Sequence, residues 1–95
     1  MRPRKQDAFT DTKAGVVTGS ISLRSNGSRL FLLNRKGATC TAVYNNAAVA
    51  GSTELSKLVC SDGNNGNATL RYGSDGKPAH VLYNAGLDGG GTVRF

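Results

Sequence analysis

The sequence predicts an all-β fold, a small antiparallel meander of six to seven short strands that forms a barrel or a sandwich. Apolar and polar residues alternate over short segments, which is the pattern of half-buried strands. The composition, with 13 glycines among 95 residues and many Asn and Ser, provides the turns between such segments. At 9.9 kDa the chain has room for one domain.

The domain is expected to occupy residues 15–95, after a flexible basic lead-in at residues 1–14. The lead-in is rich in charged residues, and Phe9 is its only sizeable hydrophobe away from the terminus. A segment of this kind has too little apolar surface to build a core.

The first half of the domain contains strand patterns separated by turns. Alternation from Val17 to Leu23 is followed by Asn26-Gly27, which favours a hairpin turn. Residues 29–34 are the most continuously apolar run and are typical of a strand covered on both faces. Residues 38–44 alternate cleanly. The apolar residues of 53–60 fit either helical or strand spacing, and the Val-Cys pair at the end favours a strand.

The last third of the chain has an internal period of thirteen residues. An Asp-Gly dipeptide begins at Asp62, Asp75 and Asp88, and a short segment ending in an aromatic residue follows each one. Asp-Gly suits tight turns because both residues tolerate positive φ. The period therefore predicts three turns that each lead into a strand.

The predicted core combines the apolar positions of these strands. Its members are Val17, Ile21, Leu30, Leu32, Cys40, Tyr44, Leu58, Cys60, Leu70, Tyr72, Val81, Tyr83, Val93 and Phe95.

The two cysteines, Cys40 and Cys60, each lie in a predicted strand, and we expect a disulfide between them. Closing a loop of about 20 residues stabilises a fold by about 3 kcal/mol in the chain-entropy model. The alternative is a pair of buried free thiols in a cytosolic protein. With one histidine and no C-x-x-C pair, a zinc site is not expected.

The formal net charge of +6 indicates attraction to polyanions, with binding that weakens as salt rises. The candidate polyanion-binding residues are Arg24, Arg29, Arg35, Lys36 and Arg71. An ordinary solvated basic surface would give the same composition. As an alternative function, the same cations could bind nucleic acid while Tyr72 or Tyr83 stacks on bases.

No catalytic set is evident, and we expect no enzymatic activity and no cofactor. His80 is the only histidine and has no nucleophile or carboxylate beside it in the sequence. The aspartates of the Asp-Gly pairs are expected at exposed turns, where nothing would separate their pKa values. A calcium-stabilised module is a further alternative, favoured weakly by the Asp, Asn and Gly residues of these turns.

Three spaced motifs resemble a small, uncharacterised β domain of bacterial exported proteins and lipoproteins. They are Gly15-x-x-Thr18-Gly19, then Asn34-x-x-Gly37-x-x-Cys40-x-Ala42-x-Tyr44, and Leu58-x-Cys60-x-Asp62-Gly63-x-x-Gly66. The resemblance implies a paired Cys40 and Cys60 and a periplasmic or cell-envelope location. It brings no catalytic residues.

The resulting expectation is a non-enzymatic envelope or secreted module that binds a polyanion or an envelope protein through a basic surface. Arg2, Arg4 and Lys5 give the chain the positive start of a signal peptide, but residues 6–15 lack its apolar stretch. A cytoplasmic location therefore stays as the alternative. No run approaches the roughly 20 apolar residues of a membrane-spanning helix.

Overall fold

A computed structural model describes residues 7–95, which form eight antiparallel strands in simple meander order, each paired with the next along the chain. The strands are β1 (Asp7–Asp11), β2 (Gly15–Leu23), β3 (Arg29–Arg35), β4 (Ala38–Tyr44), β5 (Thr53–Cys60), β6 (Gly66–Tyr72), β7 (Pro78–Asn84) and β8 (Gly90–Arg94). The predicted fold class is confirmed, with one or two strands more than expected. β1 lies in the segment predicted to be a flexible lead-in, and residues 1–6 of that segment lie outside the described part.

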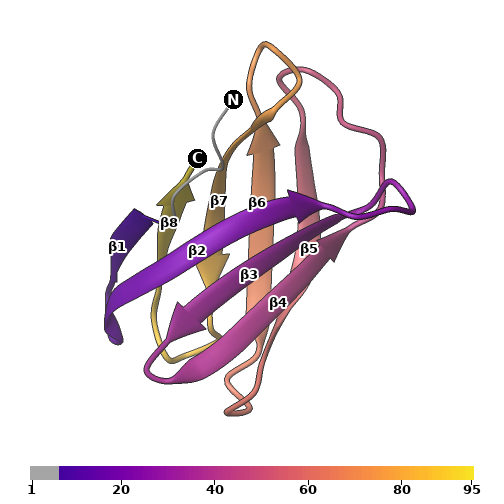
Figure 1. The fold of residues 1–95 in the computed structure, drawn as a ribbon. Coiled ribbons are helices and arrows are strands. Elements are labelled where there is room, and N and C mark those ends of the chain that lie inside the picture. The colour runs from indigo at the N-terminus through magenta and orange to yellow at the C-terminus, as the bar shows by residue number, and fades with distance from the viewer. Residues whose placement is uncertain (1–6) are drawn as a thin grey trace.

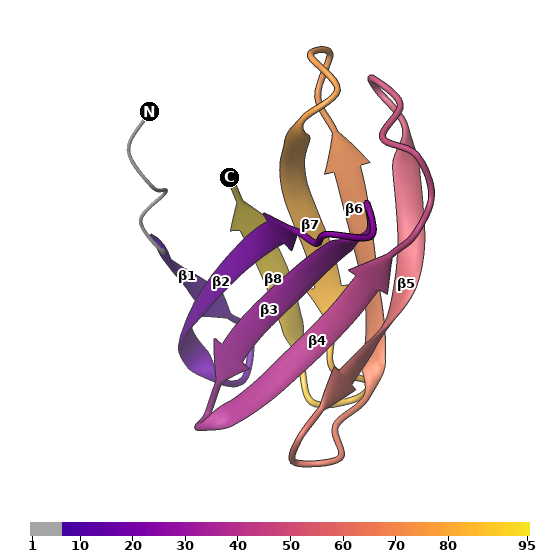
Figure 2. The same ribbon diagram turned by 45° about the vertical axis from the view of Figure 1, so that its right-hand side comes forward.

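The strands form two crossed layers that join into a nearly closed barrel (Figures 1 and 2). β1–β4 make one layer and β5–β8 the other, and the layers connect through β4 and β5. That connection has only two residue pairs, Cys40 with Cys60 and Thr41 with Val59, after which the two strands diverge. Farther along, the Ser56 hydroxyl donates to the Val43 carbonyl at 2.8 Å.

The opposite edges of the meander, β1 and β8, meet at a seam. The Thr12 amide donates to the Gly90 carbonyl at 2.9 Å, and the Gly90 amide donates to the Thr12 hydroxyl at 3.0 Å. β2 also crosses close to β8, where a Cβ on Gly19 would come within 2.9 Å of a Val93 methyl group. Glycine at this position therefore lets the two layers approach.

Most of the predicted core is buried between the layers, but the register predicted for β3 is wrong. Phe31 and Leu33 are buried, whereas Leu30 and Leu32 lie on the outer side. Side chains of a strand alternate between faces, so a run of apolar residues does not reveal which ones point inward. Ile21 and Phe95, also predicted as core, are partly buried against the central cluster.

The turns divide the barrel into two ends. At the closed end lie the β1–β2, β3–β4, β5–β6 and β7–β8 turns. At the open end lie the β2–β3 and β6–β7 turns and the β4–β5 loop. The predicted Asp-Gly turns are present, and their glycines Gly63, Gly76 and Gly89 all have positive φ.

Candidate functional site

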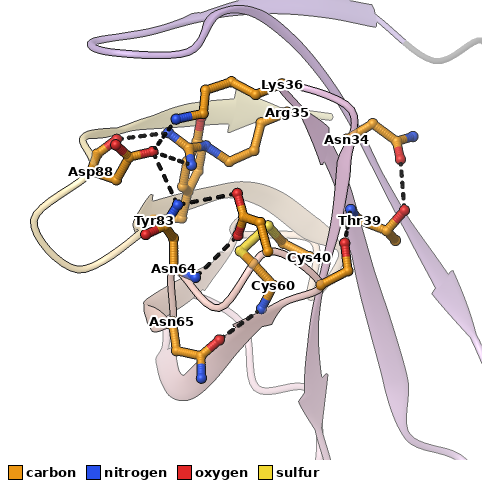
Figure 3. Close-up of a disulfide and its surroundings, with 12 residues drawn as sticks. Asn34, Arg35, Lys36, Thr39, Cys40, Cys60, Asn64, Asn65, Tyr83 and Asp88 are labelled. Carbon is orange, nitrogen blue, oxygen red and sulfur yellow. Dashed lines mark hydrogen bonds and ion pairs between the residues drawn. A yellow bond between two sulfur atoms is a disulfide. The ribbon is translucent and has the colours of Figure 1, made fainter.

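The closed end holds the predicted disulfide. Cys40 and Cys60 are bonded where β4 and β5 pair, and both residues are buried (Figure 3). The bond therefore reinforces the narrow connection between the two layers. A buried disulfide indicates an oxidising compartment.

The seam at the same end is fastened by a buried ion network centred on Arg35. The Arg35 side chain is 0% exposed, and its Nε and Nη2 donate to the two Asp11 carboxylate oxygens at 3.1 and 3.2 Å. Its Nη1 donates to Asp88 Oδ2 at 3.0 Å, and its Nη2 also donates to the Asp88 carbonyl at 2.7 Å (Figure 3). Asp11 ends β1 and Asp88 precedes β8, so one arginine on β3 joins both edges of the meander.

The surroundings of Asp11 keep it ionised. Burial alone would raise the pKa of this carboxyl, but hydrogen bonds from Arg35, the Ala14 and Lys13 amides and the Tyr83 hydroxyl together lower it to about 2. The Tyr83 hydroxyl donates at 2.7 Å, and burial together with this bond raises the pKa of Tyr83. The buried charges of Arg35 and Asp11 are thus paired with each other and hydrogen-bonded.

Asp88 differs from the expectation of an unperturbed turn aspartate. Hydrogen bonds from Lys36 and Arg35 lower its pKa, and the Lys36 ammonium lies 2.7 Å from Asp88 Oδ2. Lys36 reaches this oxygen from the β3–β4 turn, where its φ is +51°.

Two of the residues predicted to bind a polyanion, Arg35 and Lys36, instead form ion pairs at the closed end. The assignment of Arg35 to a binding surface is wrong, because its guanidinium is buried and paired with two acids. Lys36 is exposed, but its charge is paired with Asp88. The inward position of Arg35 follows from strand alternation, which places it on the same face as Phe31 and Leu33.

The two tyrosines suggested for base stacking are also unavailable. Tyr72 and Tyr83 are only 1% and 3% exposed. Tyr72 packs beneath Arg29, and Tyr83 binds Asp11. Stacking on a nucleic acid would require a solvent-exposed ring face.

The remaining candidates lie away from the closed end. Arg24 is exposed in the β2–β3 turn, and Arg29 is partly buried on the inner side of β3. Arg71 is exposed on the outer side of β6, close to the open end. The structure thus separates the five predicted cations into several regions.

Arg71 belongs to a row of basic side chains on the outer surface of β5–β8. It pairs with His80 on β7, and His80 pairs with Arg94 on β8. The neighbours Leu70, Val81 and Val93 are buried, so alternation directs the row outward. Lys57 on β5 is exposed on the same surface. We call Lys57, Arg71, His80 and Arg94 the basic face.

The outer surface of β5–β8 carries no acidic side chain. Glu54 is the only acid in these four strands, and it lies on the inner side, where its carboxylate accepts from the Asn45 and Asn46 amides. Within residues 7–95, none of the three ion pairs involves a side chain of the basic face. Arg71 and Arg94 therefore have no acidic partner among the ion pairs of the described residues.

Sequence reasoning missed His80 and Arg94 as site residues because their approach to Arg71 depends on strand register. One signal was present. Arg71 and Arg94 each precede the aromatic residue that closes a period of the Asp-Gly repeat. β6 and β8 run in the same direction on either side of β7, so equivalent repeat positions reach the same level of the sheet.

No protein-family model, curated protein or solved structure matches the chain. Within residues 7–95 there is no helix long and apolar enough to cross a membrane. The same residues contain no group of three or more His, Cys, Asp or Glu side chains placed to hold a metal ion.

Proposed function

We propose that this protein is a non-enzymatic binding module that holds a polyanionic polymer against its basic face. The observation that carries the proposal is the row Arg71, His80 and Arg94, which lies across three strands of an acid-free sheet surface. Strands lie about 4.8 Å apart, so the row extends over about 10 Å. A polymer with negative groups along its length could pair with several of these side chains together.

The chemistry of the surface favours recognition by charge. Between the cations lie Leu55, Thr69, Leu82 and Thr92, which form the next outward row. Neither row contains a Phe, Tyr or Trp side chain on which a base could stack. A carboxylated, sulfated or phosphorylated polymer therefore suits the face better than a nucleic acid, which is the alternative ligand.

The proposed location is the periplasm, cell envelope or extracellular medium. It is supported by the buried Cys40–Cys60 disulfide and by the resemblance to exported bacterial domains. Mass spectrometry after alkylation of the denatured, unreduced protein from separated cell fractions tests this. Unalkylated cysteines in the envelope fraction are expected, and alkylated cysteines in the cytosol would refute the location.

Heparin provides a convenient charged probe of the basic face, and single-stranded poly(dT) tests the nucleic-acid alternative. Arg71→Ala and Arg94→Ala should each weaken heparin binding by about threefold or more, as expected from losing one charge contact. Lys13→Ala removes the same charge from an exposed turn at the closed end and should have a smaller effect.

Equal losses from all three variants would mean that net charge alone drives binding and would refute a localised face. Absence of heparin binding at low salt would refute the polyanion proposal. Tighter binding of poly(dT) than of heparin, lost in the Arg71 and Arg94 variants, would favour the nucleic-acid alternative.

A further inference from the structure

The open end contains a half-enclosed pocket of about 270 Å³, whose lining includes no residue of the basic face. Ile21, Ser22, Leu23 and Arg29 line it from β2 and β3, and Gly76, Lys77 and Pro78 line it from the β6–β7 hairpin. The pocket forms where the two layers diverge. The disulfide and the Arg35 ion network, which hold the layers together, both lie at the closed end.

Arg29 gives the pocket its charge. It shares the inner side of β3 with Phe31 and Leu33, so its side chain points toward the interior of the barrel at the open end. Its guanidinium carbon lies 5.5 Å from the centre of the Tyr72 ring, a cation–π contact that holds it in place. Arg29 is partly buried but forms no ion pair within residues 7–95.

A partly buried arginine normally has an anionic partner, because removing a charge from water is costly. Burial raises the pKa of the Tyr72 hydroxyl, and the nearby Arg29 charge partly offsets this rise. Lys77 is a second cation at the rim. The nearby Asp75 carboxylate accepts from the Lys77 backbone amide at 3.0 Å and forms no ion pair with Lys77 in the described structure.

The rest of the lining is mostly apolar. Leu23 is 70% exposed at the rim, Ile21 packs against the core, and Pro78 lies opposite on the hairpin. At about 30 Å³ for each water-sized group, the volume accommodates roughly nine non-hydrogen atoms. This combination suits a ligand with a short apolar chain and one negative group.

We infer that the open-end pocket binds a small amphipathic anion, with the negative group between Arg29 and Lys77 and the chain against Ile21, Leu23 and Pro78. Ser22 also lines this wall. The inference does not depend on the proposed polyanion function, since it uses a different part of the surface and a different class of ligand.

Octanoate is a suitable probe because it has ten non-hydrogen atoms and one carboxylate. In a titration followed by ¹H–¹⁵N NMR, we expect saturable shifts of the amides of residues 21–23 and 76–77, with a dissociation constant below about 1 mM. Octanamide, its uncharged counterpart, should bind at least about tenfold more weakly, because it lacks the charge-assisted contacts.

Arg24 provides a matched control, since it is an exposed arginine at the other side of the same turn and does not line the pocket. Arg29→Gln should weaken octanoate binding by about tenfold or more, and Arg24→Gln by less than about twofold. Lys77→Gln, at an exposed position, should weaken it by about threefold and tests the inference even if Arg29→Gln fails to fold.

Several results would overturn the inference. They are an absence of saturable shifts at the pocket, equal binding of octanamide and octanoate, and equal effects of the Arg24 and Arg29 substitutions. Arg71→Ala and Arg94→Ala should leave octanoate binding unchanged, so failure at the pocket and failure at the basic face can be distinguished.

Discussion

Arg29 and Arg35 lie at the two ends of the same inward-facing row of β3, but only Arg35 has acidic partners. Arg35 is fully buried between Asp11 and Asp88, where it closes the seam between β1 and β8. Arg29 lies over the Tyr72 ring at the open end and lines a pocket. Arg35 therefore stabilises the closed end of the barrel, whereas Arg29 contributes a positive charge to the pocket at the open end.

Replacing Arg35 should severely destabilise the protein. Arg35→Met keeps much of the side-chain volume but leaves the Asp11 carboxylate buried without its cation, and such a loss costs about 3–5 kcal/mol. Chemical denaturation should show this decrease in the free energy of unfolding. Arg24→Met, at an exposed turn, should change it by less than about 0.5 kcal/mol. A similar small change for Arg35→Met would contradict the proposed closure of the seam.

Acid should weaken the native protein through Asp11. Its pKa in the folded state is about 2, below the ordinary value of 3.8, so folding favours the ionised form. The resulting stabilisation, on the order of 2 kcal/mol, is complete above about pH 5 and is lost as the pH falls toward 2. Asp88, whose pKa is also lowered, acts in the same direction.

Denaturation between pH 6 and pH 2 measures this dependence. In Arg35→Met the cation that lowers the pKa of Asp11 is absent, so the loss of stability on acidification should be much smaller than in the wild type. Parallel pH profiles for the two proteins would show that the acid sensitivity arises elsewhere.

Removing the disulfide should loosen the joint between the two layers. Cys40→Ala combined with Cys60→Ala is expected to lower the free energy of unfolding by about 3 kcal/mol. The effect is expected to be large because β4 and β5 share only two residue pairs. A reducing agent should destabilise the wild type and leave the double variant unchanged. Equal stability of the oxidised wild type and the double variant would exclude this function of the bond.

The fold class and the disulfide could be predicted from the sequence because they depend on local patterns. Alternation defined β4, and the Asp-Gly dipeptides located the turns before β6, β7 and β8. β1 was missed because its five residues are held by pairing with β2, which its own sequence of Asp, Ala, Phe and Thr does not reveal. Tertiary context decides such short strands.

The errors in the predicted site have a similar cause. The uninterrupted apolar run around Phe31 concealed which residues of β3 point inward. Arg35 was placed on the surface because the strand was expected to end at Asn34, one residue before it. The basic face joins residues of different strands, and only the register places His80 between Arg71 and Arg94. The charge of the surface could be predicted from the composition, but its location could not.

The salt dependence of heparin binding tests the basic face most directly. The measurement compares the slope of log K against log salt for the wild type, for Arg71→Ala with Arg94→Ala, and for Lys13→Ala. If the row contacts the polyanion, the double variant should have a slope shallower by about 1.4–1.8, or about 0.7–0.9 for each lost contact, with little change for Lys13→Ala. A double variant with the wild-type slope would contradict the proposal that this face binds the polymer.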